Sequence, residues 1–147
     1  MLHRHGPTTR ARIEQRVSAA LAEMPGLVAA WGFGSFFRGE PFRDLDVAVL
    51  LEPSVRSDPR FAGRLAAHLE RLTGRPRLAV DLKLLDLAPV RFQHAVLRDG
   101  RLLCCRDDTT RVRFEAESLG RYLDYQPVLA FFDHAALDRL GEVSDGR

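Results

Sequence analysis

The stretch GFGSFFRGEPFRDLDVAVLL, residues 32–51, decides most of what the sequence predicts. It closes one apolar run, residues 27–33, and leads into a second one, residues 46–51. Apolar runs of this length, rich in strand-forming side chains, are typical of strands buried on both faces. A third run, residues 78–85, alternates, with Asp81 and Lys83 on one face of the expected strand and apolar side chains on the other. The sequence therefore predicts a sheet built around these three strands.

Helical patterns separate the predicted strands. Apolar residues at helical spacing occupy residues 13–24, and Pro25-Gly26 ends that helix. A second helix is predicted with Asp58 as its N-cap, Pro59 in its first turn and Gly74 at its end. A short helix from residue 89 and a short strand over residues 101–105 follow. Strands alternating with helices indicate an α/β (α+β) fold, in which helices flank a small sheet.

The last part of the chain, about residues 109–140, is predicted to be a helical segment that Pro127 kinks or divides. With 147 residues, the chain is expected to form a single domain over residues 1–147, with its sheet at about 27–105. Most of the large apolar side chains in the C-terminal segment are expected to pack on the sheet, and any that stay exposed would suit a partner protein. These residues are Phe114, Leu119, Tyr122, Leu129, Phe131 and Phe132.

Composition excludes several classes of protein. Apolar residues make up 46% and charged residues 29%, which excludes a disordered tail, a collagen-like repeat and a disulfide miniprotein. The net charge of +2 is too small to indicate a nucleic-acid or membrane surface. The arginines among the first sixteen residues, such as Arg10, are expected to form a solvated tail and helix face. Adjacent Cys104 and Cys105 do not suggest a structural disulfide, and neither a secretory leader nor a membrane span is evident, so we expect a cytoplasmic protein.

Three carboxylates carry the predicted chemistry. Asp44 and Asp46 form a D-x-D pair at the entrance of the second strand, so their side chains project to the same face. Asp81 lies inside the third strand, where a lone carboxylate is costly unless it is paired or bound to a cation. If the two strands are neighbours, the three carboxylates converge, and such hard oxygen ligands suit Mg²⁺ or Mn²⁺. An ion pair between Asp81 and Lys83 is the structural alternative.

Gly34 and Ser35 come directly after the first strand and before a predicted helical turn. Glycine lets the backbone approach a ligand closely, and the free N–H groups at the start of a helical turn favour phosphate. A turn of this kind shortly before a metal-binding D-x-D is suited to hold a nucleoside triphosphate against its metal ions. An ordinary Gly-Ser turn remains the alternative when this motif is considered alone.

Residues 32–51 resemble the Gly-Ser loop and D-x-D of the DNA polymerase β-type nucleotidyltransferase superfamily. Within it, the chain is most similar to the minimal nucleotidyltransferases (MNT), small proteins that often act as antitoxins to HEPN-domain ribonucleases. Arg38-Gly39 and Asp81 also match the family's pattern, and the resemblance extends over about residues 26–129.

The sequence departs from the family at two points. Eight residues separate Ser35 from Asp44, fewer than in many antitoxin members, so the loop over the phosphates is shorter. Phe36 and Phe37 also replace the small or polar residues that are common there. Both departures could alter which nucleotide fits.

The resemblance implies a polymerase β-like fold, with a small mixed sheet flanked by helices and a C-terminal helical segment. It also implies the transfer of AMP from ATP to an acceptor hydroxyl. The implied catalytic residues and ligands of two Mg²⁺ ions, with Mn²⁺ possible, are Asp44, Asp46 and Asp81. Asp81 would also take the proton from the acceptor hydroxyl. The implied nucleotide-binding residues are Gly34, Ser35 and Arg38, although a salt bridge from Arg38 to Glu40 or Asp44 is equally open.

The chain leaves little room after the sheet for a domain that binds an acceptor, so the acceptor is expected on another chain. In the antitoxin members the acceptor is a tyrosine of the HEPN toxin, which is adenylylated within a hetero-oligomer. Two alternatives remain: an antitoxin with weak or no catalysis that inhibits by binding, and a nucleotidyltransferase for a small acceptor such as an aminoglycoside. Nucleic-acid binding has the least support, since the basic N-terminal residues are not interleaved with aromatic ones.

Overall fold

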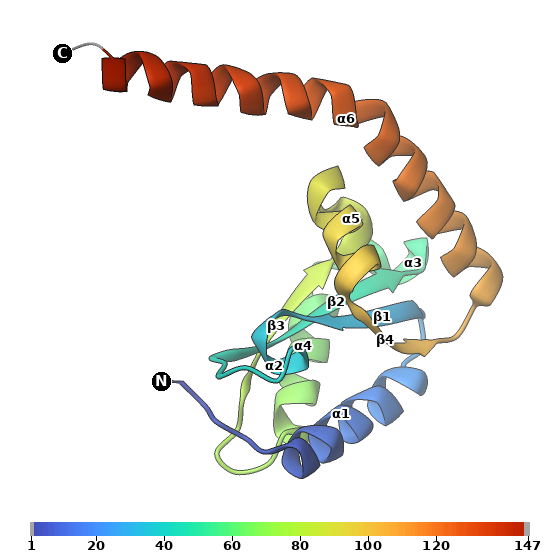
Figure 1. Cartoon of the computed structure of the whole chain (residues 1–147). Helices are drawn as coiled ribbons and strands as arrows, with labels where there is room; N and C mark the ends of the chain where they lie inside the picture. Colours follow the sequence, from blue (N-terminus) through green and yellow to red (C-terminus); the bar gives the residue numbers. More distant parts are fainter. Residues whose placement is uncertain (1, 146–147) are drawn as a thin grey trace.

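The computed structural model describes residues 2–145, without the side chains of Leu129 and of residues beyond 139. Its centre is a four-stranded sheet in the order β3-β2-β1-β4 (Figure 1). β1 (Leu27–Phe33) pairs antiparallel with β2 (Asp44–Leu51) and with β4 (Arg101–Cys105). At the other edge β2 pairs parallel with β3 (Ala79–Leu84). The sheet is therefore mixed, as the sequence predicts.

Helices cover both faces of the sheet (Figure 1). α1 (Pro7–Ala22) and α4 (Phe61–Leu72) pack on one face, and α5 (Val90–Asp99) and the first part of α6 (Asp108–Asp145) pack on the other. A single turn, α2 (Gly34–Phe37), follows β1, and the short helices α3 (Pro53–Arg56) and η1 (Leu85–Leu87) complete the fold. The predicted α+β class, a small mixed sheet flanked by helices, is confirmed.

The strands place apolar and acidic side chains on opposite faces. Along β2, Leu45, Val47 and Val49 belong to the core cluster shared with α1 and α4. Along β3, Val80 packs in that same cluster. Because side chains alternate along a strand, the even-numbered positions of β2 and the odd-numbered positions of β3 face α5 instead. This second face carries the acidic residues.

Several element boundaries differ from the predicted ones. β2 begins at Asp44, so both aspartates of the D-x-D lie inside the strand. α4 begins at Phe61 with Arg60 at its N-cap position, and Asp58 Oδ1 accepts a hydrogen bond of 2.9 Å from the N–H of Arg60 in the turn just before the helix. Asp58 is therefore not the N-cap that the sequence predicts. Cys104 and Cys105 are both free thiols.

α6 is one helix of 38 residues with Pro127 inside it, and it bends and extends away from the sheet (Figure 1). The prediction that most of its large apolar side chains pack on the sheet is wrong. Phe114 is buried, but Phe131 and Phe132 are 69% and 60% exposed. Leu119 is also exposed, and the side chain of Leu129 lies outside the described part of the chain. None of the described helices combines the length and the apolar character needed to cross a bilayer.

Candidate active site

The parallel pairing of β2 and β3 brings the predicted acidic residues together. Asp46 and Asp81 are register partners on these adjacent strands, so their side chains leave the sheet on the same face. Asp44 lies two residues before Asp46 and shares that face. β1 ends beside them, because Phe33 is the register partner of Asp46 on the other side. The turn that begins at Gly34 therefore starts next to the carboxylates.

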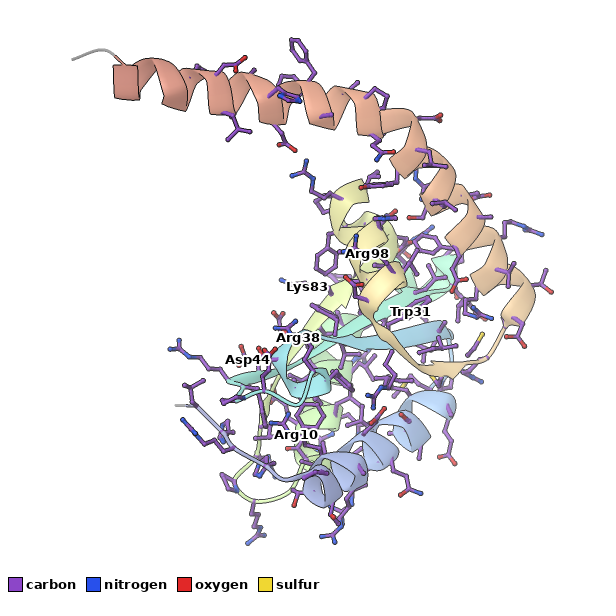
Figure 2. All side chains as sticks on the ribbon, viewed as in Figure 1. Arg10, Trp31, Arg38, Asp44, Lys83 and Arg98 are labelled. Atoms are coloured by element: carbon purple, nitrogen blue, oxygen red, sulfur yellow. The ribbon has the colours of Figure 1, made fainter. Side chains whose placement is uncertain are left out.

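Asp46 carries the electrostatic signature of the site. Burial raises its pKa to about 6, and the negative charges of Asp81 and Asp44 add to that effect. The cations Lys83 and Arg38 lower the pKa in part. Figure 2 shows Arg38, Asp44 and Lys83 on the ribbon. The site thus concentrates more negative charge around a half-buried carboxylate than its own cations neutralise.

Asp81 is paired in the free protein. Lys83 Nζ lies 3.5 Å from Asp81 Oδ1, and the two side chains are 52% and 43% exposed. An ion pair so exposed contributes little to stability, because water screens it and two flexible side chains must be ordered. The half-exposed position also removes most of the desolvation cost that a carboxylate inside a strand would otherwise carry. Lys83 can therefore leave Asp81 at little cost.

The three aspartates fit a magnesium site by the chemistry of their donors. Mg²⁺ takes oxygen ligands and is usually held by one or two carboxylates together with substrate phosphates and water. Among the described residues, no three acidic, histidine or cysteine side chains are gathered closely enough to hold a metal ion by themselves. A site of facing carboxylates, open to a phosphate-bearing substrate, agrees with this preference.

Gly34 passes close to Asp46. Its φ of +77° lies in the left-handed region that favours glycine, and a Cβ at this position would overlap Asp46 Oδ2. Only glycine therefore lets the backbone pass so close to the carboxylate of Asp46. The first N–H groups of a helical turn have no partner within the turn, so those at the start of α2 are available to a ligand beside Asp46.

Arg38 stands over the turn with its side chain exposed. Its Nε donates a hydrogen bond of 3.2 Å to Glu40 Oε1, and its Nη2 donates one of 3.3 Å to Ser35 Oγ. Of the two salt-bridge partners that the sequence left open, the structure selects Glu40. The contact with Ser35 places the guanidinium and the hydroxyl of the predicted phosphate-binding residues side by side.

Phe36 and Phe37 serve packing. Phe36 is buried, and its ring meets that of Phe42 edge to face with 4.9 Å between centroids. The ring of Phe37 fills the space beside Gly32, where a Cβ would overlap it. Gly32 is thus required to make room for this ring.

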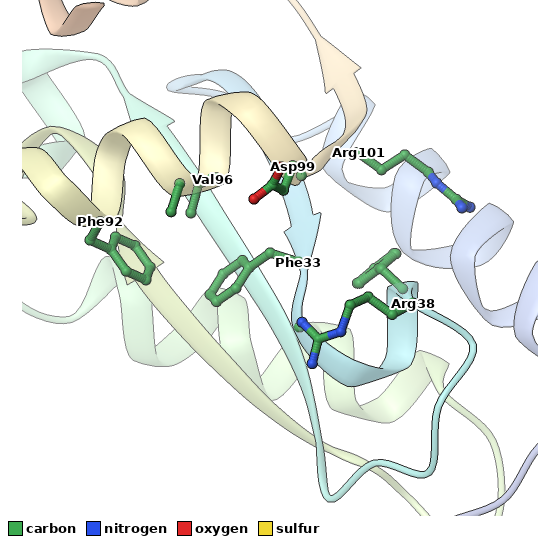
Figure 3. Close-up of a pocket in the computed structure, with 10 residues that line it drawn as sticks. Phe33, Arg38, Phe92, Val96, Asp99 and Arg101 are labelled. Carbon is green, nitrogen blue, oxygen red and sulfur yellow. The ribbon is translucent and has the colours of Figure 1, made fainter. Parts of the chain in front are cut away.

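Two cavities flank the turn. One of about 290 Å³ is lined by Ser35, Asp44 and Asp46 together with residues of the following segment. The other, of about 250 Å³, lies on the far side of Gly34. Figure 3 shows its apolar part, Phe33, Phe92 and Val96, and its charged part, Arg38, Asp99 and Arg101. The carboxylates and the turn are therefore both accessible to a ligand.

Arg10 is a residue that sequence reasoning missed. It does not lie on a solvated face as expected, because its guanidinium donates hydrogen bonds to the carbonyls of His5, Phe36 and Glu40. No signal in the sequence separates it from Arg12 and Arg16 on the same helix. Its partners are backbone atoms, which sequence patterns do not reveal.

Comparisons with known proteins place this site in context. The family described as "Polymerase beta, Nucleotidyltransferase" matches residues 15–109, more than half of the chain. No curated protein matches the sequence.

Solved structures share the fold. One similar chain, in a toxin–antitoxin structure with AMP-PNP, is 23% identical, with 83% of this chain and 98% of that chain covered and a TM-score of 0.65. Another comes from a complex of a tri-AMPylated Shewanella oneidensis HEPN toxin with an MNT antitoxin; it is 22% identical, with 86% and 98% covered and a TM-score of 0.64. A third, from the toxin–antitoxin MntA-HepT, is 20% identical, with 84% and 97% covered and a TM-score of 0.62.

Proposed function

Because the chain belongs to the polymerase beta nucleotidyltransferase family, we propose that it is a minimal nucleotidyltransferase that transfers AMP from ATP to a HEPN-domain toxin. The acceptor is a hydroxyl group, in this proposal that of a tyrosine, and the transfer makes the protein an antitoxin. The observation that carries the proposal is the register pairing of Asp46 with Asp81 beside the Gly34 turn. The similarity to a chain from a complex that contains an AMPylated HEPN toxin adds support.

In this proposal the triphosphate of ATP binds over α2. The N–H groups at the start of the turn and the Ser35 hydroxyl donate to phosphate oxygens. Arg38 exchanges Glu40 for a phosphate oxygen, which costs little because their ion pair is exposed on both sides. The shape of the turn, fixed by Gly34, orients the α-phosphate toward the carboxylates.

Asp44, Asp46 and Asp81 would hold two Mg²⁺ ions, with Mn²⁺ as a substitute. When bound, the ions neutralise the triphosphate and lower the pKa of the acceptor hydroxyl. Asp81 accepts the hydroxyl proton on its carboxylate, and Lys83 is released from its ion pair as this occurs. The acceptor oxygen then forms a bond to the α-phosphorus, the bond from that phosphorus to pyrophosphate breaks, and pyrophosphate leaves.

The acceptor arrives on a second protein in this proposal, so the working form is a hetero-oligomer with the toxin in the cytoplasm. Exposed apolar side chains on α6, Phe131 and Phe132 among them, supply surface for such a partner.

The test is a transfer assay with ATP labelled at the α-phosphate, Mg²⁺ and the protein encoded by the neighbouring gene. Label is expected on the neighbour after denaturing electrophoresis, and it should vanish with Asp44→Asn. Label on an added aminoglycoside in the absence of any second protein would instead indicate a small-molecule acceptor.

A second candidate, inhibition of the toxin by binding alone, is favoured by one observation. Lys83 forms an ion pair with Asp81, one of the three proposed metal ligands. A toxicity assay separates the two functions. Equal protection by the wild type and by Asp44→Asn would defeat catalysis as the mechanism and support binding.

A further inference from the structure

Arg10 connects α1 to the segment that links Ser35 to Asp44, residues 36–43, here called the linking segment. Its Nη1 donates a hydrogen bond of 2.6 Å to the carbonyl of Phe36, and its Nη2 donates one of 2.6 Å to the carbonyl of Glu40. Its Nε donates one of 2.8 Å to the carbonyl of His5. A planar guanidinium presents its donors in a fixed fork, so one side chain can hold three carbonyls at once.

The same guanidinium lies over the rings that anchor the linking segment in the core. Its central carbon is 5.2 Å from the ring centre of Phe36 and 4.9 Å from that of Phe42. Both rings are buried. A cation held at this distance from an aromatic ring is attracted by the ring's electron density. Arg10 therefore contacts the linking segment near both of its ends.

Two of the carbonyls that Arg10 binds, those of Phe36 and Glu40, lie in and just after the turn that carries the predicted phosphate ligands. The carbonyl of Phe36 also accepts a hydrogen bond of 3.2 Å from the N–H of Gly39, whose φ is +77°. The N–H of Glu40 donates one of 3.0 Å to the carbonyl of Ser35. Arg38 lies within the short stretch of chain that these two hydrogen bonds close. The direction in which Ser35 and Arg38 point thus depends on backbone that Arg10 holds.

We propose that Arg10 is a positioning residue for nucleotide binding, which keeps the linking segment in the conformation that sets Ser35, Arg38 and Asp44 at the spacing ATP requires. This inference rests on the proposed function. Ordering a loose backbone costs conformational entropy. A segment held in place before the nucleotide arrives does not incur that cost on binding, and affinity rises accordingly. Without Arg10, part of the binding free energy of ATP is consumed in ordering the segment.

Three variants test the proposal in the full-length protein. Arg10→Ala removes the fork and the charge. Arg10→Lys keeps the charge and the aliphatic stem but reaches fewer carbonyls, because an ammonium lacks the planar fork. Arg12→Ala is the matched control, since Arg12 lies on the same helix with its side chain exposed. If Arg10→Ala does not fold, Arg10→Lys carries the test.

Two measurements decide the outcome: calorimetric affinity for the α,β-methylene analogue of ATP with Mg²⁺, and amide hydrogen exchange in residues 36–43. Arg10→Ala is expected to weaken the affinity at least tenfold and to accelerate exchange in the linking segment. Arg10→Lys should fall between it and the wild type, and Arg12→Ala should match the wild type. In the transfer assay the loss should appear mainly as a raised KM for ATP.

The inference and the proposed function fail in different ways. A lower melting temperature with unchanged affinity and unchanged exchange would overturn the role of Arg10 and make it structural only. Absence of transfer by a wild type that still binds the analogue would defeat the proposed function alone. No binding of the analogue by the wild type would overturn both.

Discussion

At the scale of single residues, Gly34 and Gly39 form a natural pair for experiment. Both have a φ of +77°, but a Cβ at Gly34 would overlap Asp46, whereas one at Gly39 would meet nothing within 4 Å. Alanine at either position should cost about 1–3 kcal/mol of backbone strain. Gly34→Ala must in addition displace Asp46, so transfer should fall about 100-fold or more. Gly39→Ala should lose less activity and less stability than Gly34→Ala, because no side chain has to move, as measured by the labelled-ATP assay and urea denaturation.

Asp46→Asn should separate stability from activity. Folding raises the pKa of Asp46 from 3.8 to about 6, so the folded state binds this proton more tightly than the unfolded chain does. The free energy of unfolding without metal should therefore fall as the pH rises through this interval, and it should stay lower above it. The asparagine variant removes this dependence. It should be more stable by about 1 kcal/mol at pH 7.5 in EDTA, a value reduced for the partial exposure of the group, and inactive in transfer.

The control for that measurement is Asp99→Asn, on an exposed carboxylate whose pKa is lowered by its hydrogen bond with Arg98. It should not gain stability above pH 6. If Asp46→Asn is no more stable than the wild type at pH 7.5, the result would contradict the unfavourable burial and charge repulsion inferred for Asp46.

The sequence predicts the residues of the site better than it predicts the residues that hold them in position. Asp44, Asp46 and Asp81 can be singled out because carboxylates are conspicuous in apolar strands, and Gly34 because of its place after a strand. Their proximity needed one further fact, the parallel pairing of two strands that an intervening helix separates. The role of Arg10 could not be predicted, because hydrogen bonds to distant backbone carbonyls leave no trace in residue types.

At the scale of elements, a buried polar network joins α5 and α6. Gln93 Nε2 donates hydrogen bonds of 3.0 and 3.2 Å to the carbonyls of Leu85 and Ala88. Gln93 Oε1 accepts bonds of 2.9 Å from Ser118 and 3.3 Å from Arg121. Because Gln93 and Ser118 are buried, water cannot replace lost partners.

Gln93→Leu should therefore destabilise the protein by about 2–3 kcal/mol, since it removes the partner of the Ser118 hydroxyl and of the Ala88 carbonyl and one of the two donors to the Leu85 carbonyl. Ser118→Ala should cost only about 1 kcal/mol, because Arg121 still donates to Gln93. Urea denaturation of both variants checks the order. A larger loss for Ser118→Ala than for Gln93→Leu would contradict the central place of Gln93 in this junction.

The exposed part of α6 should matter for the partner and not for the fold. Replacing Phe131 and Phe132 together by serine should leave the melting temperature within a degree or two, because both side chains are exposed. Co-purification with the toxin should weaken markedly. Leu87→Ser, at an apolar side chain of η1 that is 67% exposed, is the control and should bind as the wild type does. Unchanged co-purification of the double variant would place the interface elsewhere.

Element positions could be predicted where local patterns decide them. β1 occupies the predicted residues 27–33, because a short, continuous apolar run of strand-forming residues favours a buried strand. The burial of α6 could not be predicted, because it depends on what the helix has to pack against. At 1.5 Å per residue, its 38 residues span about 57 Å, whereas the 10 residues of α5 span about 15 Å, so most of α6 passes beyond its support.

At the scale of the whole molecule, ATP with Mg²⁺ should stabilise the folded chain by mass action. A ligand at 100 times its Kd that binds only the folded state adds about 2.7 kcal/mol, or about 5–10 °C in melting temperature for a chain of this length. Asp44→Asn should show little of this shift while it melts normally without ligand. Differential scanning fluorimetry measures both melting temperatures. An equal shift of the melting temperature in the wild type and in Asp44→Asn would place the nucleotide away from the aspartates.

β3 lies at the edge of the sheet and, within the part of the chain that the structure describes, pairs with β2 alone. Side chains alternate with a period of two, so a slip of one residue would turn Asp81 toward α4 and place Val80 or Leu82 opposite Asp46. The observed register of β3 is therefore required to place Asp81 beside Asp46 and on the same face as Asp44. In the proposed function, a chain that has formed the β1–β2 pair but has not yet docked β3 lacks one of its three metal ligands, so the appearance of transfer activity during refolding should mark the docking of this edge strand.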